Sequence, residues 1–169
     1  NCPNENCSKS FIGYYNFSSG NNWNFNYGTS QGNLIGKSFN EVIVEISPMF
    51  EIIYNQAFSA EQQNLKEISG VGYRKALEFL IKDYLIARDE KTKDKILKMR
   101  LGNCIKDLVE DTRIKTVAKR AVWLGNDETH YLRKWEGKDL SDLKKLIDLT
   151  VHWIEMEKLT ESFEDEMPD

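Results

Sequence analysis

The sequence has no apolar run that approaches the ~20 consecutive residues needed for a membrane-spanning helix. We therefore expect no transmembrane helix and no membrane partner. Cysteine is also scarce, with three residues in a chain of 169. An odd number of cysteines without dense spacing excludes a disulfide framework and favours a reducing compartment. The expected location is the cytoplasm.

The sequence also lacks a strong excess of charge of either sign. It has 23 basic and 27 acidic side chains, a formal net charge of -4. Five of the acids lie in the last ten residues, TESFEDEMPD, which we expect to form a frayed, solvated acidic tail over 160–169. The remainder is nearly neutral. This balance excludes a broad phosphate-binding surface and leaves room for a local basic patch.

The first 46 residues differ from the rest of the chain because they are rich in asparagine and aromatic residues. Trp23, Phe25 and Tyr27 alternate with asparagines, a period of two that is typical of a half-buried strand. The segment SSGNN before them supplies turn residues. The segment FNEVIVEI, which ends before Pro48, is a third strand candidate. The sequence therefore predicts a small antiparallel β segment over 1–46.

From Ser47 onward the pattern becomes helical. Ser47 and Pro48 supply an N-cap and a proline at the first helical position, and apolar residues then recur at spacings of three and four. A second stripe predicts a helix over about 67–88. Gly70 and Gly72 lie near its start, and close contact with another helix would explain two glycines there.

Three further helices are predicted from apolar stripes later in the chain. The charged segment 87–100 is interpreted as a connection, and 129–139 as an irregular link. Five helices with short links predict a mainly α fold, a helical bundle over 47–159. Of the three later helices, the first contains Leu101 and Ile105. The second contains Ile114 and Val122 and stops at Gly125. The third contains Leu143 and Ile147 and is capped by Asp139 or Ser141.

Cys2 and Cys7 are the only residues that suggest a metal site, and their spacing lies in the zinc-knuckle range. A structural zinc site needs four ligands, and no second cysteine pair follows. Two readings stay open: two free thiols, or half of a zinc ribbon whose other pair lies upstream of Asn1. No cofactor is expected.

Basic side chains mark two candidate binding regions. Arg74 and Glu78 are four residues apart on the predicted helix, so they can form an ion pair. Arg74 and Lys75 form either a solvated face or one side of a groove beside His130. A second strip carries Arg113, Lys115, Lys119 and Arg120, of which the last three share one side; it is a solvated helix face or a phosphate contact. His152 is expected to be packed or interfacial rather than catalytic.

Two motifs resemble a known family. YRKALEFL early in one helix and WLGNDETH at the end of another, with FEIIYNQAFSA upstream, resemble the domain-of-unknown-function 4145 family over about residues 47–155. That family is similar to the HEPN superfamily of helical domains, which occur in bacterial defence, toxin and RNA-processing systems. The resemblance implies a HEPN-like helical bundle and a homodimer.

Active HEPN ribonucleases carry arginine, a polar residue, three further residues and histidine near a helix terminus. The resemblance places Asn126 and His130 at the polar and histidine positions. A histidine can move a proton near neutral pH, and an arginine can stabilise charge on a phosphate. Gly125 stands where the arginine is expected, and Asp127 and Glu128 add negative charge beside an incoming phosphate. The arginines that could replace it in space are Arg74, Arg113, Arg120 and Arg133.

Three interpretations of this motif stay open: a turn-locking structural role, a binding site that does not cleave, and a working nuclease. We expect a defence-associated module that binds RNA, another nucleic acid or a partner protein without strong catalysis. One alternative is a metal-independent endoribonuclease that uses His130 with Asn126. The other is a pure interaction or dimerisation domain. The expected binding residues are Arg74, Lys75, Arg113, Lys119 and Arg120.

Overall fold

The computed structural model describes residues 10–18, 20, 22–29 and 35–167, and the chain divides into two compact units, residues 1–36 and 37–169. Each unit is described by itself. Cys2 and Cys7 lie outside the described residues. None of the helices in the described part of the chain combines the length and apolar character required to span a bilayer.

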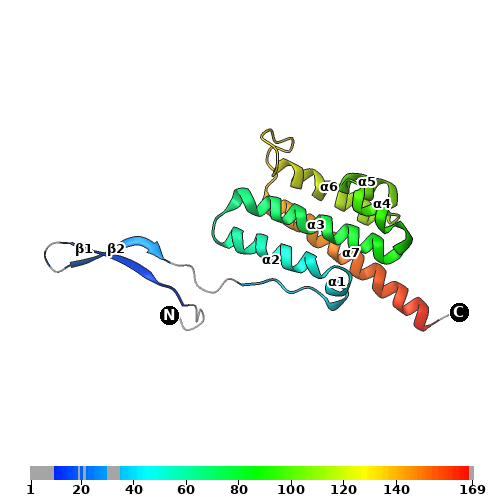
Figure 1. The fold of residues 1–169 in the computed structure, drawn as a ribbon, viewed down its shortest axis with the longest axis horizontal. Coiled ribbons are helices and arrows are strands. Elements are labelled where there is room, and N and C mark those ends of the chain that lie inside the picture. The colour runs from blue at the N-terminus through cyan, green and yellow to red at the C-terminus, as the bar shows by residue number, and fades with distance from the viewer. Residues whose placement is uncertain (1–9, 19, 21, 30–34, 168–169) are drawn as a thin grey trace. The chain divides into compact units, whose positions relative to one another are not determined.

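The first unit contains an antiparallel hairpin of β1 (Gly13–Ser18) and β2 (Asn22–Thr29) (Figure 1). The predicted two-residue period and the turn are confirmed, and Gly20 in the turn has a φ of +116°, a conformation that favours glycine. Aromatic rings pair across the strands, with Phe17 and Trp23 5.1 Å apart. These rings are exposed rather than half-buried, since Trp23 keeps 67% of its surface accessible.

The predicted third strand is wrong, because FNEVIVEI forms helix α1 (Glu41–Ile46). The Asn40 side chain caps this helix by accepting a hydrogen bond from the N–H of Val42. The apolar residues Phe39, Ile43 and Ile46 have helical spacing, and Ile43 is fully buried in the core of the second unit. The cap and the core contact outweigh the β propensity of the branched side chains.

The second unit is a bundle in which the described residues form seven α-helices rather than about five (Figure 1). Ser47 and Pro48 begin α2 as predicted, and Asp139 forms a capping box with Asp142 at the last helix. The segment interpreted as a charged connection contains a short 3-10 turn (Glu90–Thr92) and a helix. After α1 the helices are α2 (Pro48–Gln62), α3 (Lys66–Arg88), α4 (Lys93–Lys98), α5 (Leu101–Leu108), α6 (Thr112–Asp127) and α7 (Leu140–Glu166).

Two helix ends differ from the expectation. Helix α6 does not stop at Gly125 but continues to Asp127, so Gly125 lies inside a helix. Helix α7 continues to Glu166, so residues 160–166 are helical rather than a frayed tail, and all of them except the half-buried Glu161 are exposed. Tertiary contacts hold the last turn of α6 in place, and in the sequence Pro168 follows shortly after the end of α7.

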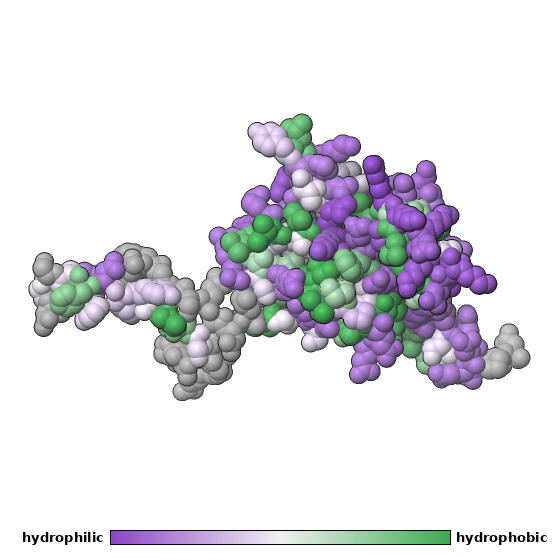
Figure 2. Space-filling model, viewed as in Figure 1, coloured by the Kyte–Doolittle hydropathy of each residue, from purple (hydrophilic) through white to green (hydrophobic). Residues whose placement is uncertain are grey.

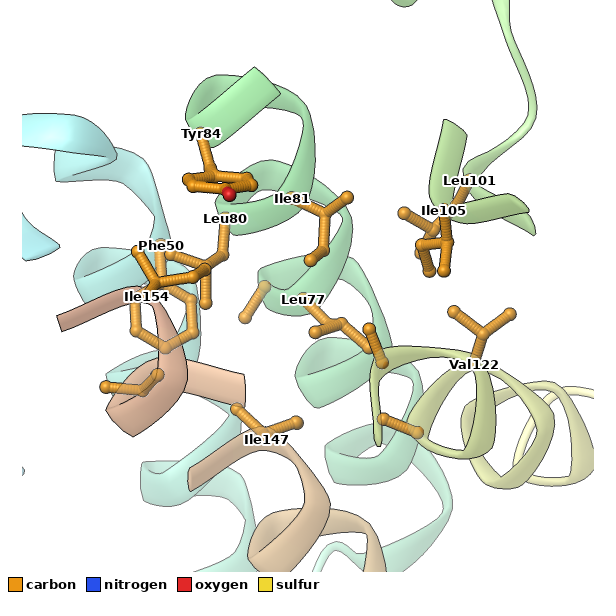
Figure 3. Packing of buried hydrophobic residues seen from close by; sticks show 14 of the residues in the cluster. Phe50, Leu77, Leu80, Ile81, Tyr84, Leu101, Ile105, Val122, Ile147 and Ile154 are labelled. Atoms are coloured by element: carbon orange, nitrogen blue, oxygen red, sulfur yellow. The ribbon is translucent and has the colours of Figure 1, made fainter. Parts of the chain in front are cut away.

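Helix α3 is the centre of the bundle and lies against all the other helices. Its buried side chains Leu77, Leu80, Ile81 and Tyr84 point toward partners from α2, α5, α6 and α7 (Figure 3). Near the start of the helix Val71 is exposed, whereas Tyr73 and Ala76 are buried. A central helix with partners on several sides fixes the positions of its polar residues, and one of these reaches the end of α6.

The two glycines near the start of α3 allow close approach, as the sequence suggested. A Cβ added to Gly72 would lie 2.8 Å from the Cβ of Ala57 on α2, and one added to Gly70 would lie 2.6 Å from the Cβ of Glu128. Side chains at either position would push α3 away from its neighbours. The second contact brings the first turns of α3 against the end of α6.

Candidate functional site at the end of helix α6

Helix α6 carries the Gly-Asn-x-x-x-His motif on its final turn and in the loop that follows. Asp111 caps its start by accepting hydrogen bonds from the N–H groups of Arg113 and Ile114, at 2.7 and 3.0 Å. The last turn contains Gly125 and Asn126, while His130 lies in the loop beyond Asp127. The cap and the buried face of α6 therefore fix the direction from which the motif leaves the bundle.

Gly125 is required by the packing of Arg74 from helix α3. A Cβ at Gly125 would lie 2.8 Å from the Cγ of Arg74 and 2.9 Å from its Cβ. These atoms are close to the α3 backbone and cannot move aside as the far end of a flexible side chain could. A side chain at this position requires that the two helices separate or that Arg74 gives up its present conformation.

The Arg74 guanidinium reaches the motif from the neighbouring helix. Its Nε donates a hydrogen bond of 2.8 Å to Oδ1 of Asn126, and its Nη1 lies 3.3 Å from Oε2 of Glu78. The predicted pair with Glu78 is therefore present, and Lys82 shares the same carboxylate at 2.9 Å. Of the four arginines considered as replacements, the structure brings Arg74 onto the asparagine of the motif.

The sequence suggested that Asp127 and Glu128 present two free negative charges. In the structure both carboxylates have partners. Asp127 is 9% exposed, and its Oδ2 accepts hydrogen bonds from the backbone N–H groups of Lys134 and Trp135, at 3.0 and 2.8 Å. Glu128 pairs with Arg133 at 3.2 Å. Burial raises the pKa of Glu128 and the Arg133 charge lowers it, with a net upward shift. Both carboxylates thus hold the loop in place.

His130 opens onto a pocket of about 760 Å³ formed by the end of α6 and its loop. Asn126 lines the same pocket, and the carbonyl oxygen of Asn126 accepts hydrogen bonds from the N–H and Oγ1–H of Thr129. The loop projects from the bundle in Figure 1, and Figure 2 shows hydrophobic atoms near its tip. The structure therefore brings the two motif side chains to one accessible pocket, which also includes Trp123, Asp127, Tyr131, Leu132, Lys134 and Trp135.

Two tryptophans on this surface were not singled out from the sequence. The rings of Trp123 on α6 and Trp135 in the loop stack 5.7 Å apart with an interplanar angle of 13°. The hydrogen bond from the backbone N–H of Trp135 to Asp127 holds the Trp135 residue in position for this stack. Their positions on either side of the motif, three residues before Asn126 and five after His130, were the available signal.

The remaining basic residues occupy different places. Lys75 lines a separate hollow of about 540 Å³ together with Arg74 and Thr129. Thr129 precedes His130 in the sequence, but His130 lines a different pocket. Lys119 lies over the Trp123 ring, 5.1 Å from its centroid. Arg113 lies at the opposite end of α6, ~20 Å from Asn126 along the helix, and stacks on Trp153 at 4.3 Å. The structure thus separates Arg113 from the motif.

His152 and Cys104 differ in their burial. His152 is exposed on α7 rather than packed. Cys104 is a buried free thiol, and burial raises its pKa. Within residues 10–18, 20, 22–29 and 35–167, no group of three or more His, Cys, Asp or Glu side chains could hold a metal ion.

The described features define a class of protein: a helical bundle in which an arginine of one helix meets an asparagine on the last turn of another, beside an accessible histidine. Residues 55–162 match the family described as Domain of unknown function (DUF4145), and the chain belongs to that family. No curated protein and no solved structure matches the chain.

Proposed function

We propose that this chain is a HEPN-like module that binds RNA at the end of helix α6 without strong catalysis, as part of a bacterial defence or RNA-processing system in the cytoplasm. The observation that carries the proposal is the 2.8 Å hydrogen bond from Arg74 to Asn126 across Gly125. It restores in space the guanidinium that the linear motif lacks. A guanidinium has five N–H donors, and two of those in Arg74 are used, so the others remain for a phosphate.

The arrangement favours binding over cleavage because the candidate proton-transfer group is not held. Among the hydrogen bonds and ion pairs of the described residues, none fixes the imidazole of His130. General acid–base catalysis depends on a positioned group, and a loose one loses most of its effect. Arg74 by contrast is held at both Asn126 and Glu78. Arg74 lines a different hollow from the His130 pocket, and a fixed cation apart from an unfixed imidazole serves recognition better than reaction.

The test is binding of a labelled single-stranded RNA in chelator, measured by fluorescence anisotropy at ~50 and ~200 mM salt. Wild-type protein should bind more weakly at the higher salt. Arg74→Gln should lower the affinity about tenfold and reduce the salt slope by about 0.7, the amount expected for one phosphate contact on a single strand. Arg100→Gln removes the same charge from an exposed residue between α4 and α5 and should leave both values unchanged. Absence of RNA binding by the wild type would refute the proposal.

The second candidate, a metal-independent endoribonuclease, is favoured by the same Arg74–Asn126 contact. It requires that RNA is cleaved in chelator and that His130→Ala abolishes cleavage with an unchanged melting temperature. A pure interaction or dimerisation domain would bind no RNA at all. The expected homodimer is tested separately by sedimentation velocity.

A further inference from the structure

A second, cationic groove lies between α5 and α6. Its volume is about 400 Å³, and four of its lining side chains are basic: Lys106 from α5 and Lys115, Lys119 and Arg120 from α6. The groove has no acidic lining residue. The chain as a whole has slightly more acidic than basic residues, so four basic side chains in one groove are a marked local concentration of positive charge.

The charges of this groove are available to an external anion. Among the described residues, no carboxylate forms an ion pair with Lys106, Lys115 or Lys119. Arg120 uses one guanidinium N–H on the carbonyl oxygen of Thr116 in its own helix, a contact that leaves its charge unbalanced. Unpaired cations that converge on one hollow form a site for a polyanion.

The groove and the pocket of His130 share one lining residue, Trp123. Trp123 lines the cationic groove, the His130 pocket and a third hollow of about 440 Å³, which Arg120 and Trp135 also line. Lys119 lies over the Trp123 ring and so marks the boundary between the cationic and aromatic parts. The three hollows around Trp123 therefore place basic and aromatic side chains on one surface path.

Resting on the proposed function, we propose that this path binds a single-stranded polynucleotide. The cationic groove takes consecutive phosphates, and the exposed Trp135 ring takes an unpaired base next to His130. A base-paired strand could not place a base on this ring, because its bases are already stacked within the duplex. Trp135 is 44% exposed, and Asp127 holds its backbone in place, so the ring is preorganised to stack. Along α6, Lys115 and Asn126 are ~16 Å apart, enough for several nucleotides.

The phosphate contacts are tested with Lys106→Gln/Lys115→Gln, measured by anisotropy with labelled single-stranded RNA across a salt series. The double variant should reduce the slope of log K against log salt by about 1.4, the value for two contacts on a single strand. Lys93→Gln/Lys95→Gln makes the same charge change on exposed residues of α4 and should leave the slope unchanged. An equal reduction of the slope in both double variants would refute phosphate binding in the groove, because the slope would then depend on net charge alone.

The stacking contact is tested at Trp135. Trp135→Leu should weaken single-strand binding about tenfold, Trp135→Phe should retain most of it, and neither should change the salt slope. A duplex of the same sequence that binds as tightly as the single strand would overturn the inference, as would polyglutamate that competes equally well.

The two proposals fail separately. Wild-type protein that binds no RNA refutes the proposed function. Wild-type protein that binds RNA, with Arg74→Gln weakened and the groove variants unchanged, refutes this inference alone.

Discussion

The substitution Gly125→Ala tests the central geometric claim, that Arg74 occupies the space a side chain at residue 125 would need. Alanine is favoured over glycine by ~1 kcal/mol in a helix interior. The added Cβ would lie 2.8 and 2.9 Å from Cγ and Cβ of Arg74, and relief by helix displacement typically costs ~1–3 kcal/mol. If Arg74 turns away instead, its hydrogen bond to Asn126 is lost, at ~1.5–3 kcal/mol for a charged donor.

Either cost, taken at the middle of its range, exceeds the gain by about 1 kcal/mol, so Gly125→Ala should reduce the free energy of unfolding by that amount. The melting temperature should fall by roughly 2–4 °C. Urea unfolding followed by far-UV circular dichroism measures the first quantity, and a thermal scan measures the second. The reasoning is refuted if the variant is as stable as the wild type or more stable.

Gly102→Ala is the matched control. Gly102 is an exposed residue in α5, and a Cβ placed there meets no atom within 4 Å. The same substitution should therefore be neutral or stabilising, by up to ~1 kcal/mol. A loss of stability at both glycines would show that the effect is generic and does not come from Arg74.

Two further substitutions test the loop after α6. Asp127→Ala removes the acceptor of the Lys134 and Trp135 N–H groups, so it should cost about 2 kcal/mol and disrupt the Trp123–Trp135 stack; an unchanged near-UV circular dichroism spectrum would contradict this role. Burial raises the pKa of Glu128 above its ordinary 4.5, so the stability it contributes is complete below pH 4.5 and is lost as the pH rises through the raised value. The stability of Glu128→Gln, which does not ionise, should therefore increase relative to that of the wild type as the pH rises above 4.5. A wild type whose stability increases relative to that of the variant would contradict this sign.

Much of the helical part of the fold could be predicted, because its signals are local. Ser47 and Pro48 begin α2, Asp139 caps α7, and the apolar spacing of α3 identifies most of its buried face. The segment FNEVIVEI was misassigned because its branched residues also suit a strand, and only the contact of Ile43 with the core decides for helix. The short helix α4 was missed because its charged sequence has a single buried residue, Ile96.

The site was less predictable, because its decisive contacts join residues far apart in the chain. Asn126 and His130 were identified, and the structure places both at one pocket. Gly125 was interpreted as a helix stop, since glycine commonly follows a C-cap. It lies within the helix, and the reason is a side chain 51 positions earlier in the sequence. No local pattern at residue 125 contains that information.

The Arg74 contact changes how the departure from the arginine motif should be interpreted. In the sequence motif alone, a glycine at the arginine position suggests loss of function. In space, the glycine is what allows α3 to bring Arg74 onto Asn126, at 2.8 Å. An arginine at residue 125 would collide with the α3 side chain, so the two arrangements exclude each other. A guanidinium from α3 is tied to Glu78 as well as to Asn126, and within the described part of the chain no hydrogen bond or ion pair anchors His130 in the same way. The arrangement therefore keeps a fixed positive charge at the end of α6 while leaving the imidazole unpositioned, and under the proposed function it would hold an RNA phosphate rather than break its ester bond.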